Sequence, residues 1–389
     1  AAATPLVPQV KERLISLLDL YGDPGAIHDE GDKALKELLV IRKEAAEAIG
    51  AHADEIVFTA SGTEANNLVI FGVATEAKGN AHIITTEIEH PSILEPLKSL
   101  EKNGVQVTKL SISSDGQVSL TELQESIADT TALVSVGLIN SEIGAIQDIR
   151  AVAKIIRAAR KSRTSHAPLY LHVDASQAPL WMQLRVEALG VDLMTLDAQK
   201  IMGPKGVGLL YVKRGTKIAP HILGGGQEGG LRSGTENVPL AGAFARALSL
   251  AGHFAEKNSE RVAQLRDLLW KEIQVSIPEA QMNGGEDSRV ANNLNISIRG
   301  LVGERAVIAL SAEGISASTR SACAAKDEDL SHVIRALYKD RSEDEAKQKA
   351  REAIRFTLLP SVTEGEVKKI ARALSRAAKM YRNIDFVGK

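Results

Sequence analysis

Short apolar runs alternate with amphipathic stretches along the first two-thirds of the chain. These runs, rich in β-branched residues, are residues 55–60, 81–86, 132–140, 168–174, 192–198 and 206–212. Their nearly continuous hydrophobicity is typical of strands buried on both faces of a parallel sheet. In a stretch between two of them, Val152, Ile155, Ile156 and Ala159 form one apolar stripe at helical spacing. The pattern predicts an α/β domain with a doubly wound sheet.

The last third of the chain predicts a smaller α+β domain. A long helix is expected from about Asn237 to Ile273, and three strand-like pieces follow it, separated by helices. These pieces are residues 292–298, 314–318 and 353–358. Thr363 and Glu366 have the spacing of a capping box and predict the start of the last helix. We expect three parts: a segment (1–10) that packs with the small domain, a large domain (11–245) and a small domain (246–389).

Composition narrows the class of protein and its partners. With 44% hydrophobic and 25% charged residues, the chain resembles an ordinary globular enzyme. Its net charge of −2 and the absence of a long apolar run argue against nucleic-acid and membrane partners. The single cysteine, Cys323, excludes an intramolecular disulfide, and the nine histidines show no metal-ligand spacing. We therefore expect no metal and a reducing compartment: the cytoplasm first, an organelle matrix as the alternative.

Polar residues follow two of the predicted strands, at the sheet edge where open α/β sheets bind ligands. Ser61, Gly62 and Thr63 open a helix, so their N–H groups and hydroxyls suit a phosphate. They equally suit an ordinary helix N-cap. His90 follows the next strand, and its imidazole suits either stacking on a ring with proton transfer or simple capping of a helix.

Two further strands bring a carboxylate and an amine to the same edge. Asp174 ends one strand, and Lys200 closely follows the next. A desolvated lysine is a Schiff-base nucleophile, and a carboxylate can pair with a pyridinium nitrogen, so with a phosphate site the pattern indicates pyridoxal 5'-phosphate (PLP). Taken singly, both residues are also explained as surface charges. The glycine-rich loop at 224–237, which carries Thr235, is a weak additional indication.

The motifs appear in an order that resembles cysteine desulfurases of the NifS/IscS type. They are SGTEANN (61–67), TTEIEHPSI (85–93), INSEIGAIQDI (139–149), HVDASQ (172–177), QKIMGPKGVGLLYV (199–212), GGGQEGGLRSGTENVP (224–239), RSAC (320–323) and IRFTL (354–358). The resemblance covers essentially the whole chain. It implies the PLP-dependent transferase fold type I (class V aminotransferase fold), with a mostly parallel seven-stranded sheet, PLP as cofactor and a homodimer.

The resemblance also implies roles for individual residues. Lys200 would hold the cofactor covalently and His90 would stack on its ring. The other expected cofactor contacts are Gly62, Thr63, Ser141, Asp174, Gln177, Asp197, Gln199 and, from the second subunit, Thr235. The expected contacts to the substrate L-cysteine are Asp23, Asn140 and Arg355. Cys323 would take the sulfur as a persulfide, alanine would leave, and a sulfur-acceptor or scaffold protein would receive the sulfur for iron–sulfur cluster assembly or tRNA thiolation.

Five positions depart from the usual pattern of that family. Asp197 and Gln199 replace a serine and a histidine, Ser141 and Asp23 each replace an asparagine, and Arg320 replaces a glycine. Two like charges about 4 Å apart repel by about 4 kcal/mol at an effective dielectric constant near 20. We therefore expect Asp197 to turn away from the phosphate, to be protonated or to weaken cofactor binding. Asp23 would weaken amino-acid binding unless the substrate differs. Arg320 would favour the thiolate of Cys323 or be an exposed loop charge.

Three functions follow from these observations. The first is a cysteine desulfurase, favoured because Lys200, Asp174, His90, Cys323 and Arg355 all stand at family positions. The second keeps the fold and cofactor but acts as a related lyase, on selenocysteine or cysteine sulfinate. The third is a degenerate, weakly active or inactive paralogue that binds a partner.

Overall fold

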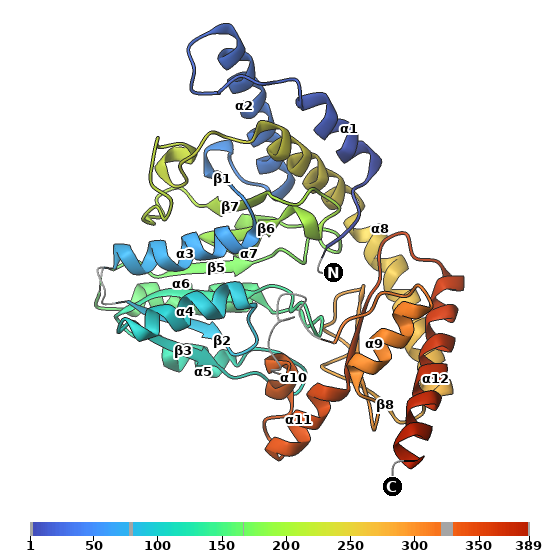
Figure 1. The fold of residues 1–389 in the computed structure, drawn as a ribbon. Helices are drawn as coiled ribbons and strands as arrows, with labels where there is room; N and C mark the ends of the chain where they lie inside the picture. The colour runs from blue at the N-terminus through green and yellow to red at the C-terminus, as the bar shows by residue number, and fades with distance from the viewer. Residues whose placement is uncertain (1–2, 78–80, 166, 320–329, 388–389) are drawn as a thin grey trace.

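Two sheets, each covered by helices, organise the chain (Figure 1). The computed structural model describes residues 3–77, 81–165, 167–319 and 330–387. The large sheet is built from the first part of the chain and the small sheet from the last part. Helix α8 (Val238–Ser276) runs from one to the other.

The large sheet has seven strands in the order β1-β7-β6-β5-β4-β2-β3. The strands are β1 (Ile56–Thr59), β2 (His82–Thr86), β3 (Gln106–Leu110), β4 (Thr131–Gly137), β5 (Tyr170–Asp174), β6 (Leu193–Asp197) and β7 (Gly208–Val212). Strands β3, β2, β4, β5 and β6 pair in parallel, whereas β7 is antiparallel to both β1 and β6. The predicted mostly parallel α/β sheet is confirmed.

The strands indicated by the sequence are the five interior strands of this sheet and β1, which lies at the edge opposite β3. The sequence carries no signal for the edge strand β3 because it is polar: Gln106 and Lys109 are exposed, and Leu110 is its one buried residue. A run of residues with that polarity does not indicate a strand buried on both faces of a sheet. Exposure of its side chains therefore hid β3, whereas the other edge strand, β1, is buried along its length and was predicted.

Alternate side chains of each strand enter two separate apolar layers. Ile83 packs with α3 (Gly62–Glu76) and α4 (Pro91–Lys102), whereas Ile84 packs on the opposite face. That opposite face is covered by α6 (Ile149–Ser162) together with α8. Further helices of this part are α1 (Pro8–Leu17), α2 (Asp29–Ile49), α5 (Leu120–Ser126) and α7 (Val186–Leu189), with short 3-10 turns η1 (Ala53–Glu55), η2 (Ala198–Lys200) and η3 (Glu228–Gly230). With both faces covered, ligands are restricted to the strand ends.

The small sheet is antiparallel, with the order β10-β9-β8. Its elements are β8 (Ala280–Met282), β9 (Asn293–Ile298), α9 (Gly303–Ala312), α10 (His332–Leu337), α11 (Glu343–Glu352), β10 (Ala353–Thr357) and α12 (Glu364–Val387). The expected strand at 314–318 is wrong: it begins with Gly314 at φ 75° and pairs only through an isolated bridge between Ser318 and Arg355. The capping box is confirmed, since Glu366 N donates to Thr363 Oγ1 and Thr363 N donates to Glu366 Oε2.

The chain near its first helix crosses the turn that carries Lys200. Thr4 N donates to Gln199 O (2.9 Å), and Met202 N donates to Thr4 Oγ1 (2.7 Å). Helix α1 then packs on α8. The division of the chain at residues 10 and 245 stays a prediction. No helix in the described parts of the chain has both the length and the apolar character needed to cross a membrane.

Candidate active site

A cavity of about 300 Å³ lies at the carboxyl ends of β4, β5 and β6. Helices α3 and α4 begin at it, and Arg355 reaches it from β10 of the small sheet. Eleven residues expected from the sequence to act in the site line this cavity: Gly62, Thr63, His90, Asn140, Ser141, Asp174, Gln177, Asp197, Gln199, Lys200 and Arg355. The topology therefore brings together side chains that are far apart in the sequence, as expected at the strand ends of an open α/β sheet.

His90 is held by a hydrogen-bond chain that begins at Asp174. Asn66 Nδ2 donates to Asp174 Oδ2 (2.9 Å) and to Ser92 Oγ (2.9 Å). Because Ser92 Oγ accepts from Asn66, its own proton is available to Nδ1 of His90, 2.8 Å away. The Ser92 backbone N–H also points at Nδ1, at 3.1 Å. Nδ1 is thus an acceptor, and the neutral ring carries its proton on Nε2.

Burial lowers the pKa of His90, and the charge of Lys200 lowers it further, against the opposing effect of Asp174. A neutral imidazole is the form that matches the two donors at Nδ1. The arrangement can therefore hold a flat, uncharged ring at the cavity wall with one movable proton on Nε2.

Glu89, next to His90, is a buried carboxyl that also lines the cavity. It accepts from Gly137 N (3.0 Å) and from Thr86 Oγ1 (2.7 Å). Burial, aided by the nearby charge of Asp174, raises the pKa of Glu89 to about 7 although these hydrogen bonds oppose the shift. Glu89 was not predicted as a site residue, because nothing in its motif distinguishes it from an ordinary surface carboxylate.

The start of α3 is engaged by a carboxylate of the same chain. Ser61 caps this helix by accepting from Glu64 N (3.1 Å). The next amide, Gly62 N, points at Asp197 Oδ2 at 3.4 Å. The carboxylate of Asp197 thus faces the amide that was expected to hold phosphate, and the three outcomes expected for it beside a bound phosphate stay predictions.

Arg355 presents a buried guanidinium to the cavity. Its Nη1 donates to Ser141 O (3.0 Å), while its buried Nε has no hydrogen-bond partner among the described residues. Burial lowers the pKa of Arg355, and Glu142 opposes this shift. Asn140, by contrast, uses its amide on the backbone, donating to Ile88 O (2.8 Å) and accepting from Glu142 N (2.9 Å). Arg355 is thus the residue with free capacity for a carboxylate.

Two expected residues lie outside the cavity. Asp23 and Thr235 are both exposed, and Thr235 Oγ1 is 3.3 Å from Asp23 Oδ2. Cys323 and Arg320 lie outside the described residues. On one side of them, Ser318 pairs with the backbone of Arg355; on the other, Ser331 Oγ donates to Glu142 Oε2.

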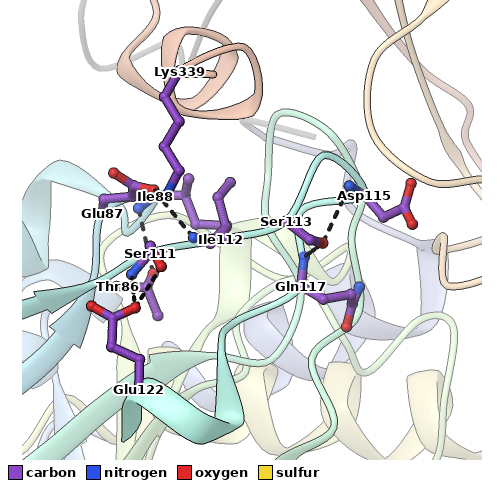
Figure 2. Close-up of polar contacts among 10 residues, drawn as sticks. All are labelled: Thr86, Glu87, Ile88, Ser111, Ile112, Ser113, Asp115, Gln117, Glu122 and Lys339. Carbon is purple, nitrogen blue, oxygen red and sulfur yellow. Dashed lines mark hydrogen bonds and ion pairs between the residues drawn. The ribbon is translucent and has the colours of Figure 1, made fainter. Parts of the chain in front are cut away.

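The segment after Ser331 is fastened to the cavity rim. His332 Nε2 lies 3.0 Å from the carbonyl oxygen of Glu89. Farther along, Lys339 forms an ion pair with Glu87 at 3.0 Å, and Glu87 also accepts from the Ile112 amide; Figure 2 shows both contacts. Neither His332 nor Lys339 was singled out in the sequence, since only the fold brings them to residues 87–90.

Other residues missed from the sequence are Asn66 and Ser92. Both lie inside motifs that had been recognised, SGTEANN and TTEIEHPSI. Their spacing from Asp174 carries no signal, because they approach it only when α3 and α4 pack on the same face of the sheet. In the described residues, no three His, Cys, Asp or Glu side chains converge as metal ligands do.

Comparison with known proteins identifies the family. The model of the family described as aminotransferase class-V matches residues 1–370. The chain belongs to that family. It is 37% identical to "Cysteine desulfurase IscS" of Dictyoglomus turgidum over 99% of this chain and 94% of the relative, and 34% identical to "Cysteine desulfurase" of Nostoc sp. over 98% and 92%.

Solved structures agree with this assignment. A "NIFS-LIKE PROTEIN" superposes with a TM-score of 0.88 at 32% identity, over 97% of this chain and 98% of that one. A structure titled "SspA in complex with cysteine" superposes with a TM-score of 0.79 at 30% identity, over 93% and 98%. The family depends on PLP, so the cavity can be tested against that cofactor.

The cavity fits PLP at its ring and substrate ends. Asn66 Oδ1 and Arg355 Nε are buried polar atoms that lack a partner among the described residues, and both side chains line the cavity. Buried polar atoms normally have partners, so these two indicate a polar group that belongs there. The amine of Lys200, the imidazole of His90 and the carboxylate of Asp174 are the groups a PLP site needs. At the phosphate end, Gly62 N is already engaged by Asp197.

Proposed function

We propose that the chain is a PLP-dependent cysteine desulfurase, which converts L-cysteine to L-alanine and transfers the sulfur to Cys323 as a persulfide. The observation that carries this proposal is one cavity lined by Lys200, His90, Asp174 and Arg355. Relatives named cysteine desulfurase, and a similar structure named as a complex with cysteine, support the substrate.

The cofactor would be held by residues of this chain. Lys200 would attach it covalently, His90 would stack on its ring, Asp174 would pair with the ring nitrogen and Gln177 with the phenolic oxygen. When bound, PLP supplies an electron-withdrawing ring that makes bonds at the substrate's Cα and Cβ breakable. Asn66 keeps the Asp174 carboxylate in position, since it donates to Oδ2 at 2.9 Å.

The substrate would be oriented by Arg355. Its buried guanidinium has a free Nε among the described residues, and a carboxylate would satisfy it through a charge-assisted hydrogen bond. His90 would hold or deliver a proton at Nε2, because Nδ1 is occupied by Ser92. In the overall transfer the C–S bond of L-cysteine breaks, its sulfur joins the sulfur of Cys323, and the carbon takes a proton to give alanine.

A homodimer is part of the proposal. Exposed apolar side chains occur just after α1, on α2 and on the segments near Asp23 and Thr235: Leu18, Tyr21, Ile27, Leu39, Val40 and Leu223. Exposed patches of this kind commonly mark protein interfaces. A second copy on this face would cover them and would bring Thr235 toward a neighbouring cavity. We further propose a cytoplasmic enzyme that passes its sulfur to an acceptor protein.

The experiment that tests the function is quantification of alanine after incubation with L-cysteine and PLP. We expect alanine from the wild type and none above background from Cys323→Ser. Alanine or sulfide release that is unchanged in Cys323→Ser would contradict the persulfide route and favour a lyase. Absence of any product from the wild type, with no visible cofactor band after added PLP, would favour an inactive paralogue.

A further inference from the structure

The amide at the start of α3 has an anion from its own chain. Asp197 Oδ2 lies 3.4 Å from Gly62 N and accepts from Gln199 Nε2 at 3.2 Å, while Oδ1 accepts from Gln199 N at 3.2 Å. The Asp197 side chain is buried, with 7% of the residue exposed. N–H groups at a helix start are a common way to bind an anion. In this chain, the N–H group of Gly62 contacts the Asp197 carboxylate instead.

The space next to Gly62 is also filled. A Cβ placed on Gly62 would lie 3.1 Å from Asp197 Cβ, 3.3 Å from Asp197 Oδ2 and 3.3 Å from Ser176 Oγ. These distances are tighter than normal side-chain contacts. A phosphate that approached Gly62 N would therefore have to move the Asp197 carboxylate or stay farther from the amide.

We propose that Asp197 is an internal competitor for the cofactor's phosphate, so that this chain binds PLP more weakly than the rest of its cavity would allow. The inference rests on the proposed function. A phosphate dianion beside Asp197 is repelled, and displacing Asp197 breaks its contacts to Gly62 and Gln199. Both effects act directly on the phosphate. The hydrogen bonds that hold His90 and Asp174 in place do not include Asp197.

The test compares two ligands that differ only in the phosphate. Apo wild type, Asp197→Ser and Asp197→Asn are titrated with PLP and with pyridoxal, and the dissociation constants are read from the absorbance change on attachment to Lys200. Asp197→Asn keeps the shape and removes the charge, and Asp197→Ser removes both. Asp148→Asn is the matched control, because Asp148 accepts from the first turn of helix α6 but is not among the residues that line the cavity. Circular dichroism checks that every variant is folded.

We expect both Asp197 variants to bind PLP at least about tenfold more tightly than the wild type, and pyridoxal within about twofold of it. Asp148→Asn should match the wild type with both ligands. Unchanged or weaker PLP binding in both Asp197 variants would overturn the inference, and so would an equal gain for pyridoxal. Those results leave the proposed function intact as long as Lys200 still takes the cofactor. Failure of Lys200 to take PLP in all the folded proteins would overturn both.

Discussion

Nδ2 of Asn66 lies 2.9 Å from Oδ2 of Asp174, so a buried amide on α3 holds the carboxylate at the end of β5. The same amide donates to Ser92 Oγ. Two elements of the sheet edge are therefore tied through one side chain that is 1% exposed. The ring end of the cavity is organised by this residue rather than by the charged groups alone.

Replacing Asn66 should destabilise the fold and the cofactor site together. Asn66→Ala leaves Asp174 Oδ2 and Ser92 Oγ without this donor, and we expect a loss of about 1–3 kcal/mol in the free energy of unfolding. Asn67→Ala is the matched control, because the contact of Asn67 Nδ2 among the described residues is to Thr63 O within its own helix. Urea unfolding measures both. Equal losses in the two variants would contradict the special position of Asn66.

Ser92→Ala should raise the pKa of His90. The wild-type hydroxyl donates to Nδ1 and thereby stabilises the neutral ring, so its removal makes protonation easier. Titration of carbon-13-labelled histidine by NMR follows this directly. Ser99→Ala, an exposed change on the same helix, should leave the pKa of His90 where it is. An unchanged or lowered pKa in Ser92→Ala would show that the hydroxyl does not hold Nδ1.

Arg355→Lys should raise the KM for L-cysteine at least about tenfold and change kcat less, because a lysine cannot make the forked contact to a carboxylate. The substituted residue is buried at the cavity, so the charge is kept but the geometry is lost. Arg351→Lys changes an exposed arginine on α11 and serves as the control. If steady-state kinetics gave the same KM for both variants, Arg355 would not be a substrate-binding residue.

Glu89 should make stability depend on pH. Its pKa is raised from 4.5 to about 7 in the folded protein, so its favourable contribution is present below about pH 4.5 and is lost as the pH rises through 7. Relative to Glu89→Gln, the wild type should lose about 2–3 kcal/mol of unfolding free energy between pH 5 and pH 8.

Urea unfolding at these two pH values measures the loss. The exposed carboxylate Glu95, on helix α4 just after Glu89, provides the control variant Glu95→Gln, which should follow the wild type. If the gap between wild type and Glu89→Gln does not change with pH, the pKa of Glu89 is not raised in the folded protein.

Much of the sheet and the site could be predicted because the information is local. The interior strands are continuous apolar runs, and Lys200 and Asp174 follow directly from their ends. What could not be predicted depends on packing. The exposed polar residues Gln106 and Lys109 made the edge strand β3 unrecognisable in the sequence. The strand expected at 314–318 is absent because Gly314 has a positive φ, which is not an extended conformation.

Inside the cavity, too, the sequence predicts which residues are present but not the contacts that packing creates. The sequence shows that Asp197 replaces the usual serine. It does not show that the Asp197 carboxylate faces the amide of Gly62, a residue 135 positions away in sequence. The alignment of Asn66, Ser92 and His90 likewise exists only after two helices pack side by side. Motifs identify which groups are present; contacts between elements decide what each group can do.

The proposed PLP chemistry depends most on the side chain of Lys200. Incubation of the protein with PLP, reduction with borohydride and peptide mapping by mass spectrometry show which amine carries the cofactor. We predict a single reduced adduct on the peptide that contains Lys200, and none in Lys200→Ala. A wild-type Lys200 peptide that remains unmodified, or an adduct that forms equally on other lysines, would contradict the account.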